Sequence, residues 1–172
     1  RKGDKAQIES VIDKLRSAMP DVVIRTTFIT GFPGETEEDF SELLTFIKEY
    51  KIEHLGVFAY SCEEGTPASK LPDQIDEDVK NERLNALMTL QQEISYNKNQ
   101  DKIGKIIKVL VEGYEEESYM FYGRSEADSI GVDGTVYFAA KDELRAGEFV
   151  WVKVLDASEY DLIGEQIVDE ID

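Results

Sequence analysis

The pattern of apolar residues changes once in this sequence, near residue 102, and no single architecture fits both sides of the change. Before that point, apolar residues at helical spacing alternate with runs of β-branched and aromatic residues. After it, short apolar runs are separated by turns rich in glycine and acidic residues. We therefore expect two domains, residues 1–102 and residues 103–172.

The first domain alternates helix and strand. The expected elements are a helix at 4–19, a strand at 22–29, a helix capped by Thr36 and Asp39, a strand at 54–61 and a helix at 76–102. This order is typical of βαβ units and a parallel sheet. Both strands are apolar enough for burial on two faces, so we expect further strands upstream and a chain that is a piece of a longer protein.

The second domain contains about five short strand candidates in roughly 70 residues. They lie at 106–111, 120–122, 135–138, 149–154 and 161–164. This density is typical of a small closed antiparallel five-stranded barrel of the oligonucleotide-binding (OB) kind.

Charge and composition exclude several classes of function. The chain has 19 basic and 37 acidic residues, a net charge of −18, and residues 103–172 alone hold 6 basic and 17 acidic residues. Such a charge disfavours nucleic acid as a direct partner, because phosphates would be repelled. No apolar run is long enough to cross a membrane and no signal peptide is present, so we expect a cytoplasmic protein without a membrane partner.

The turn Gly31-Phe32-Pro33-Gly34 is the first candidate site. A glycine-rich turn between strand and helix can cradle phosphate, but Glu35 and three further acidic residues open the helix and would repel an anion. Two interpretations remain: a tight turn before a well-capped helix, or a ligand site at the carboxyl end of a parallel strand. In the second case the glycines would let a flat cofactor approach the backbone.

The cysteine, the histidine and the aromatic residues of the second domain say less about function. Cys62 is the one cysteine, which excludes a disulfide framework and a four-cysteine cluster site. A Cys62–His54 dyad is excluded, because about 25 Å of extended strand separates them; we interpret Cys62 as incidental and His54 as structural. The barrel aromatics could stack bases, but their acidic surroundings favour core packing or a protein contact. They are Tyr119, Phe121, Tyr122, Tyr137, Phe138 and Trp151.

Three motifs together resemble a known family. They are the run from Thr27 to Thr36 (TFITGFPGET), Phe58-Ala59-Tyr60-Ser61, and Gly65-Thr66-Pro67-Ala68. In this combination they resemble the methylthiotransferase branch of the radical SAM enzymes, and the part after residue 102 resembles the TRAM domain of that branch. The resemblance covers essentially the whole chain.

Within that branch the sequence is most similar to the enzymes that modify a ribosomal protein. Thr27 stands where the tRNA-modifying members usually have aspartate, and the stretches 123–137 and 159–164 are similar to the ribosomal-protein branch. The acidic second domain agrees, because a TRAM domain that holds tRNA should be basic, whereas an acidic one suits a basic ribosomal protein.

The resemblance implies a fold and an activity. The fold would be the C-terminal part of a radical SAM (TIM-like) α/β barrel followed by the TRAM barrel. The activity would be transfer of a methylthio group to the β-carbon of an aspartate in a small-subunit ribosomal protein, with two [4Fe-4S] clusters and S-adenosylmethionine as cofactors of the full-length protein. The family's CxxxCxxC motif is absent. We therefore expect the cluster cysteines upstream, no metal, no cofactor bound to this chain alone, and no catalytic residue or activity in it.

The resemblance also implies which residues border S-adenosylmethionine. Ile29, Gly31 and Phe32 would lie near the adenine, and the backbone of Phe58, Ala59 and Tyr60 would line its edge. Arg25 and Thr27 share a strand face and would point into the barrel lumen. The alternative for all of them is packing within the barrel.

Two other functions remain open at this point. The protein could be a tRNA adenosine methylthiotransferase, in which case tRNA affinity should collapse with salt. It could also be a non-catalytic module whose acidic barrel docks a basic partner. A CxxxCxxC motif in the coding sequence upstream of Arg1 would settle the class.

Overall fold

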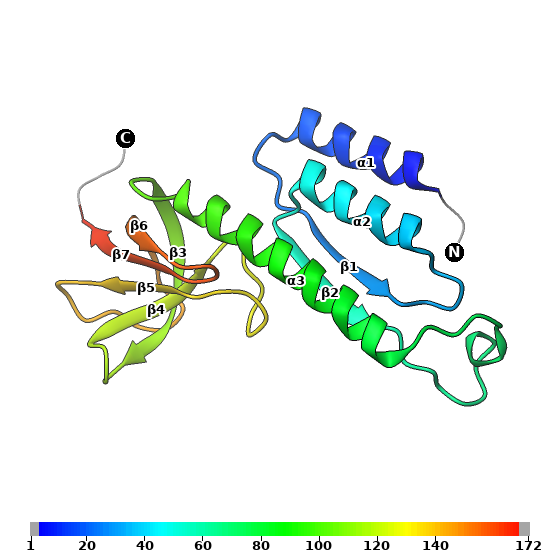
Figure 1. Ribbon diagram of the computed structural model, residues 1–172. Helices are drawn as coiled ribbons and strands as arrows, with labels where there is room; N and C mark the ends of the chain where they lie inside the picture. Colours follow the sequence, from blue (N-terminus) through cyan, green and yellow to red (C-terminus); the bar gives the residue numbers. More distant parts are fainter. Residues whose placement is uncertain (1–3, 169–172) are drawn as a thin grey trace.

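The computed structural model describes residues 4–168, which form an α/β part joined by one long helix to a β-barrel (Figure 1). The α/β part contains α1 (Lys5–Ala18), β1 (Arg25–Thr30), α2 (Glu37–Tyr50), β2 (His54–Ala59), the short 3₁₀ helix η1 (Ala68–Lys70) and α3 (Glu77–Gln100). The barrel contains β3 (Ile106–Glu115), β4 (Met120–Ser125), β5 (Val136–Ala139), β6 (Phe149–Ala157) and β7 (Leu162–Ile167).

Strands β1 and β2 form a two-stranded parallel sheet, which confirms the predicted βαβ unit. The sheet buries one face against the three helices. Its core contains Ile12 of α1, Phe46 and Ile47 of α2, Leu55 and Val57 of β2, and Leu87 and Ile94 of α3. On the other face, Arg25 contacts the barrel, whereas Thr27 and Ile29 of β1 are exposed within residues 4–168. The expected burial of both faces requires further strands and stays a prediction.

Local sequence signals account for the start of the second helix. The Thr36 side chain accepts a hydrogen bond from the Asp39 backbone N–H at 3.1 Å, and the Asp39 carboxylate accepts one from the Thr36 N–H at 2.9 Å. This reciprocal pair satisfies two backbone donors that a helix start leaves free. The predicted cap is therefore confirmed.

The five C-terminal strands close into a barrel in the order β3-β4-β5-β7-β6. The prediction of a closed five-stranded barrel is confirmed, but the prediction that it is wholly antiparallel is wrong, because β5 and β7 pair in parallel. The reason is arithmetic: an odd number of strands closed into a ring cannot alternate direction all the way round. At least one parallel pair must occur, and it falls where β7 returns beside β5.

The barrel interior is filled by aliphatic side chains around Phe138, which is fully buried. Two register shifts, at Val111/Gly113 and at Val154/Asp156, bend β3 and β6 and so help the small sheet to close.

Helix α3 connects the two parts and binds both. Its buried Leu87 and Ile94 pack in the core of the α/β part. Near its end, Ser95 and Gln100 each donate a 2.7 Å hydrogen bond to backbone carbonyls in the β6–β7 segment. The barrel therefore lies at the amino ends of β1 and β2 (Figure 1). Within residues 4–168, every helix is too short or too polar to span a bilayer.

Candidate functional site

The uncovered face of the sheet carries the most exposed apolar residues of β1 and β2. Ile29 and Phe58 are neighbours across the two strands, and 58% and 64% of their surfaces are exposed. Phe32, just past β1, is 44% exposed, and its ring meets the Tyr60 ring edge to face at 5.2 Å between centroids. The carboxyl end of the sheet therefore presents an aromatic and aliphatic surface of the kind that binds a flat apolar ligand.

The structure places the predicted site residues at three positions along the sheet. Ile29, Phe32, Phe58 and Tyr60 lie together at the carboxyl end, with Gly31 and Ala59 between them in the chain. The Tyr60 N–H is fixed by a 2.9 Å hydrogen bond to the Thr30 carbonyl. Thr27 lies opposite Gly56 midway along the sheet. Arg25 lies at the amino end, where it forms an ion pair with Asp133 of the barrel.

The Tyr60 hydroxyl, like Arg83 Nε, is a buried polar group at this end of the sheet that has no hydrogen-bond partner among residues 4–168. Burial, and then the neighbouring Cys62, raises the pKa of the Tyr60 phenol. The hydroxyl therefore stays protonated at neutral pH.

The Glu35 side chain stabilises the glycine turn by accepting hydrogen bonds. Its Oε1 accepts hydrogen bonds from the Gly31 N–H at 2.9 Å, from the Thr30 hydroxyl at 3.1 Å and from Arg83 Nη1 at 2.6 Å. From the sequence alone, the Glu35 carboxylate was expected to repel an anion at this turn. In the fold Arg83 neutralises Glu35, and their sequence separation of 48 leaves no periodic signal that could have predicted the pair.

The positive φ of Gly31, 74°, is required by the turn, and the space beside this residue is taken by Lys80. A Cβ added at Gly31 would lie 2.4 Å from Lys80 Cγ. Lys80 is itself buried, with its Nζ 2.7 Å from Glu77 and 5.4 Å from the centre of the Tyr60 ring. The absence of a side chain at Gly31 therefore makes room for Lys80. A ligand would have to approach the turn from a side that Lys80 does not occupy.

We predict that Gly31→Ala lowers the free energy of unfolding by roughly 2–3 kcal/mol, part from the left-handed backbone and part from displaced Lys80. Gly34→Ala is the matched control, because Gly34 also has a positive φ (84°) but nothing lies within 4 Å of its Cβ position. The control should lose only roughly 1 kcal/mol. Urea unfolding measures both, and equal losses would show that the Lys80 contact is unimportant.

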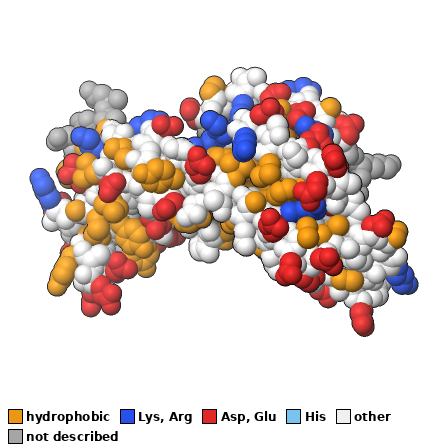
Figure 2. Space-filling model, viewed as in Figure 1, with side chains coloured by type: hydrophobic (Ala, Val, Ile, Leu, Met, Phe, Trp, Pro, Cys, Tyr) orange, Lys and Arg blue, Asp and Glu red, His pale blue; other side chains and the backbone are white. Residues whose placement is uncertain are grey.

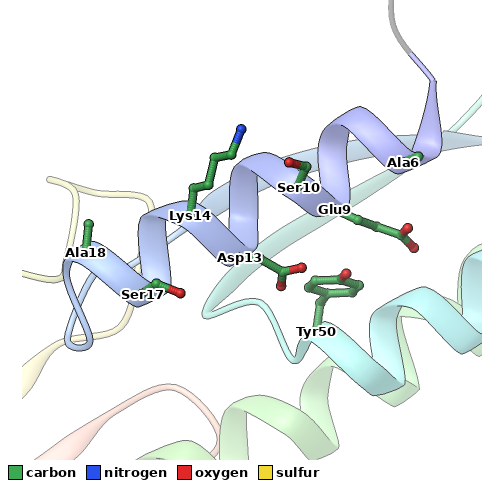
Figure 3. Close-up of a pocket in the computed structure, with 8 residues that line it drawn as sticks. All are labelled: Ala6, Glu9, Ser10, Asp13, Lys14, Ser17, Ala18 and Tyr50. Atoms are coloured by element: carbon green, nitrogen blue, oxygen red, sulfur yellow. The ribbon is translucent and has the colours of Figure 1, made fainter.

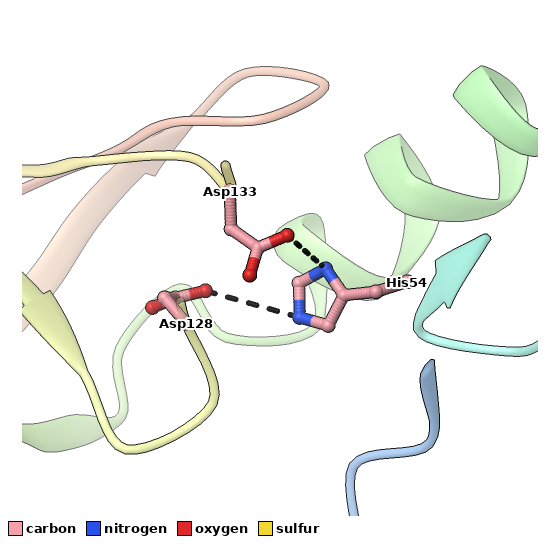
Figure 4. Close-up of side chains that lie close together, drawn as sticks. All are labelled: His54, Asp128 and Asp133. Carbon is pink, nitrogen blue, oxygen red and sulfur yellow. Dashed lines mark ion pairs between the residues drawn. The ribbon is translucent and has the colours of Figure 1, made fainter. Parts of the chain in front are cut away.

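A second group of polar residues lies in a groove of about 690 Å³ between the sheet and the barrel. His54, at the start of β2, faces two carboxylates of the β4–β5 connection (Figure 4). Its Nδ1 is 3.1 Å from Asp133 Oδ1 and its Nε2 is 3.9 Å from Asp128 Oδ1. From the sequence His54 was expected to be structural, and these partners, which lie more than seventy residues away, leave no signal near it.

Asp133 is the most connected side chain of this group. Burial would raise the pKa of its carboxyl, but hydrogen bonds from Arg25 and from the Ser129 N–H, with the nearby His54, hold that pKa below its ordinary value. Asp133 is therefore ionised at neutral pH and tethers the barrel loop to the sheet.

A third hollow, of about 660 Å³, lies between α1 and α2. Figure 3 shows Glu9 and Asp13 of α1 turned toward Tyr50 of α2 across it. Burial, and then Asp13 and Glu9, raises the pKa of Tyr50. The remaining walls are mostly small side chains that offer no convergent set of donors, so we assign it no ligand.

The barrel aromatics fall into two classes. Phe138 is buried in the core and Phe121 packs against it, as core packing requires. Trp151 and Phe149 are 41% and 64% exposed, with Lys108 Nζ 5.9 and 4.9 Å from their ring centres. Acidic side chains are spread over both parts of the molecule on the face shown in Figure 2, with apolar groups between them.

Comparison with known proteins gives consistent results for both parts. Residues 103–167 match the family model described as TRAM domain. The chain is 48% identical over 167 residues to the ribosomal protein uS12 methylthiotransferase RimO of Acetivibrio thermocellus, which covers 97% of this chain and 37% of that protein. It is 52% identical over 162 residues to the protein of the same name from Desulforamulus reducens, covering 94% of this chain and 36% of the relative. The chain thus spans a little over a third of the length of these curated relatives.

Proposed function

Because this chain is a homologue of the ribosomal protein uS12 methylthiotransferases over nearly its whole length, we propose that it forms part of an enzyme that transfers a methylthio group to ribosomal protein uS12. The observation that carries the proposal is the 48–52% identity, which extends through the α/β part and the barrel alike. The resemblance of the motifs specifies the acceptor further as the β-carbon of an aspartate.

We propose that the α/β part is the C-terminal segment of a radical SAM barrel. Its two strands are parallel, its helices cover one face, and the opposite face exposes Ile29 and Phe58. In a closed α/β barrel the helices lie outside and the uncovered face lines the lumen, with ligands at the carboxyl ends of the strands. Further strands from the rest of the protein would complete the ring.

The residues at the carboxyl end fit S-adenosylmethionine. The exposed apolar surface of Ile29, Phe32 and Phe58 suits packing against adenine, and the backbone of Phe58, Ala59 and Tyr60 offers edge contacts. Together these groups would orient the cofactor and exclude water from it. When bound, the cofactors supply the radical chemistry that an unactivated C–H bond requires, together with the sulfur and the methyl group.

Cys62 alone cannot hold an iron–sulfur cluster. It is exposed and is the one cysteine of the sequence, whereas a [4Fe-4S] cluster is held by several thiolates. We therefore assign this chain no part in holding either cluster, and we propose that the isolated chain is inactive.

We propose that the barrel contacts the ribosomal protein rather than RNA. Residues 103–172 carry 6 basic and 17 acidic residues, a charge that attracts a basic protein and repels a phosphate backbone. The exposed Trp151 and Phe149 would add apolar contact area to such an interface.

The test uses the full-length protein, reconstituted with its clusters and given S-adenosylmethionine, reductant, sulfide and either uS12 or tRNA. We expect mass spectrometry to find a methylthio group on one aspartate of uS12 and none on tRNA. Modified tRNA adenosine, with uS12 unchanged, would reject the proposal in favour of a tRNA enzyme. Failure of both substrates with intact clusters would favour a non-catalytic module.

The cofactor surface is tested in the same protein with Ile29→Glu. We expect at least tenfold weaker binding of S-adenosylmethionine in equilibrium dialysis, since a charge would replace an apolar contact. Ile163→Glu is the control, because Ile163 is 42% exposed but belongs to the barrel. Equal affinities in the two variants, at equal iron content, would place the cofactor elsewhere.

A further inference from the structure

We propose that His54 and Asp128 bind a divalent transition-metal ion, with Asp133 orienting the imidazole, in the groove between the sheet and the barrel. This inference is independent of the proposed enzymatic function. It concerns a site at the amino end of the sheet, opposite the surface assigned to S-adenosylmethionine, and it uses residues from both parts of the chain (Figure 4).

The spacing of the three side chains allows them to converge on one ion. His54, Asp128 and Asp133 can each present one ligand atom such that all three atoms lie within 4.8 Å of one another. The Nε2 of His54 and the Oδ1 of Asp128 are 3.9 Å apart, which is too long for a hydrogen bond. Two ligands of a tetrahedral zinc ion at about 2.0–2.1 Å lie roughly 3.3 Å apart, so a small closure would complete the site.

The second oxygen of Asp128 is already committed. Its Oδ2 accepts hydrogen bonds from the Ser125 N–H at 3.1 Å and the Ser125 hydroxyl at 2.5 Å. Both bonds hold the carboxylate in place and leave Oδ1 facing the imidazole (Figure 4). A fixed carboxylate oxygen opposite a ring nitrogen is a preorganised pair of ligands.

Asp133 supplies the supporting contact that metal-binding histidines usually have. Its Oδ1 lies 3.1 Å from His54 Nδ1, so a proton on Nδ1 leaves the lone pair of Nε2 free for a metal. Its other oxygen is held by Arg25 and by the Ser129 N–H at 2.7 Å. The carboxylate is therefore fixed on both sides, and Arg25 offsets part of its charge.

The surroundings of the three side chains determine the expected affinity of the site and the kind of ion that it would bind. The side chains of His54, Asp128 and Asp133 are 22%, 10% and 6% exposed, so an ion could enter while most of its shell stays protected. Lys98, Lys102 and Lys105 also line the groove and oppose a cation. With two direct protein ligands we expect micromolar binding, completed by water. Imidazole with carboxylate suits Zn²⁺ or Co²⁺.

The experiment uses this chain, untagged and with Cys62→Ser, because the exposed thiol could bind metal itself. Calorimetric titration with Zn²⁺ should show one site. His54→Ala and Asp128→Asn should each weaken it at least tenfold, and Asp133→Asn by roughly tenfold to a hundredfold. Asp142→Asn, an exposed barrel residue outside the group, is the matched control and should leave the affinity unchanged.

Two further readouts make the result decisive. Bound Co²⁺ should give the visible absorption of an ion with fewer than six ligands, and Zn²⁺ should raise the melting temperature of the parent but not of Asp128→Asn. Asp128→Asn is nearly isosteric, so it decides the matter if His54→Ala does not fold. Equal Zn²⁺ affinity in the parent and Asp128→Asn, or no binding, would show that these side chains form only an ion-pair cluster. The assay contains no cluster or S-adenosylmethionine, so its failure leaves the enzymatic proposal untouched.

Discussion

Replacing Arg83 with methionine should lower the free energy of unfolding of this chain by about 3–5 kcal/mol. The Arg83 and Glu35 side chains are only 6% and 13% exposed, and Nη1 of Arg83 lies 2.6 Å from Oε1 of Glu35. The guanidinium also pairs with Glu37 and lies 5.3 Å from the centre of the Phe40 ring. Methionine keeps the apolar packing but leaves the Glu35 carboxylate buried without its counter-charge.

Urea unfolding at neutral pH, followed by far-ultraviolet circular dichroism, measures this loss. Glu37→Gln is the control, since the Glu37 side chain is 77% exposed and should contribute less than about 1 kcal/mol. The double variant Glu35→Gln, Arg83→Met should be more stable than Arg83→Met alone, because a neutral amide still accepts the turn's hydrogen bonds without a buried charge. A loss below about 1 kcal/mol in Arg83→Met would contradict the electrostatic account of the turn.

Truncation of Phe138 to alanine should destabilise the barrel by about 3–5 kcal/mol. The Phe138 side chain is fully buried, and its ring stacks on that of Phe121 at 6.0 Å between centroids. A barrel of five short strands has few other large side chains with which to fill the void. Collapse around the cavity is limited because the closed hydrogen-bonded ring resists contraction.

The single tryptophan, Trp151, lies on β6 and reports unfolding of the barrel by fluorescence. Phe149→Ala provides the comparison, because Phe149 is 64% exposed and loses mainly its contact with Lys108, worth about 0.5–1 kcal/mol. Similar midpoints for the two variants would mean that Phe138 is not the centre of the barrel core.

Sequence predicted the elements whose causes are local. The Thr36–Asp39 cap, the parallel β1–β2 pair and the five barrel strands follow from periodicity and turn chemistry within short windows. The strand ends were less accurate: the predicted strand 22–29 begins only at Arg25, because the pairing with β2 begins at Arg25 and His54. Where a strand begins depends on its hydrogen bonds to the neighbouring strand, which lies elsewhere in the sequence.

Contacts between distant residues were beyond sequence reasoning. The parallel β5–β7 pair is a property of ring closure, and the pairs Glu35–Arg83 and His54–Asp133 join segments that only the fold brings together. Ile29 and Phe58 were named as candidate cofactor contacts by resemblance to a family, and their exposure became visible only in the structure. Their part in binding a cofactor stays a prediction.

The end of the sheet at which the barrel lies has a consequence for the proposed protein substrate. Arg25 and His54 touch the barrel, whereas Ile29 and Phe58 lie toward the other end of the same two strands. Six residues of strand span roughly 17 Å. If the barrel binds the substrate protein and the cofactor lies at the carboxyl end of the sheet, as proposed above, the substrate must reach at least that far. Such an enzyme would select a target residue carried on an extended segment.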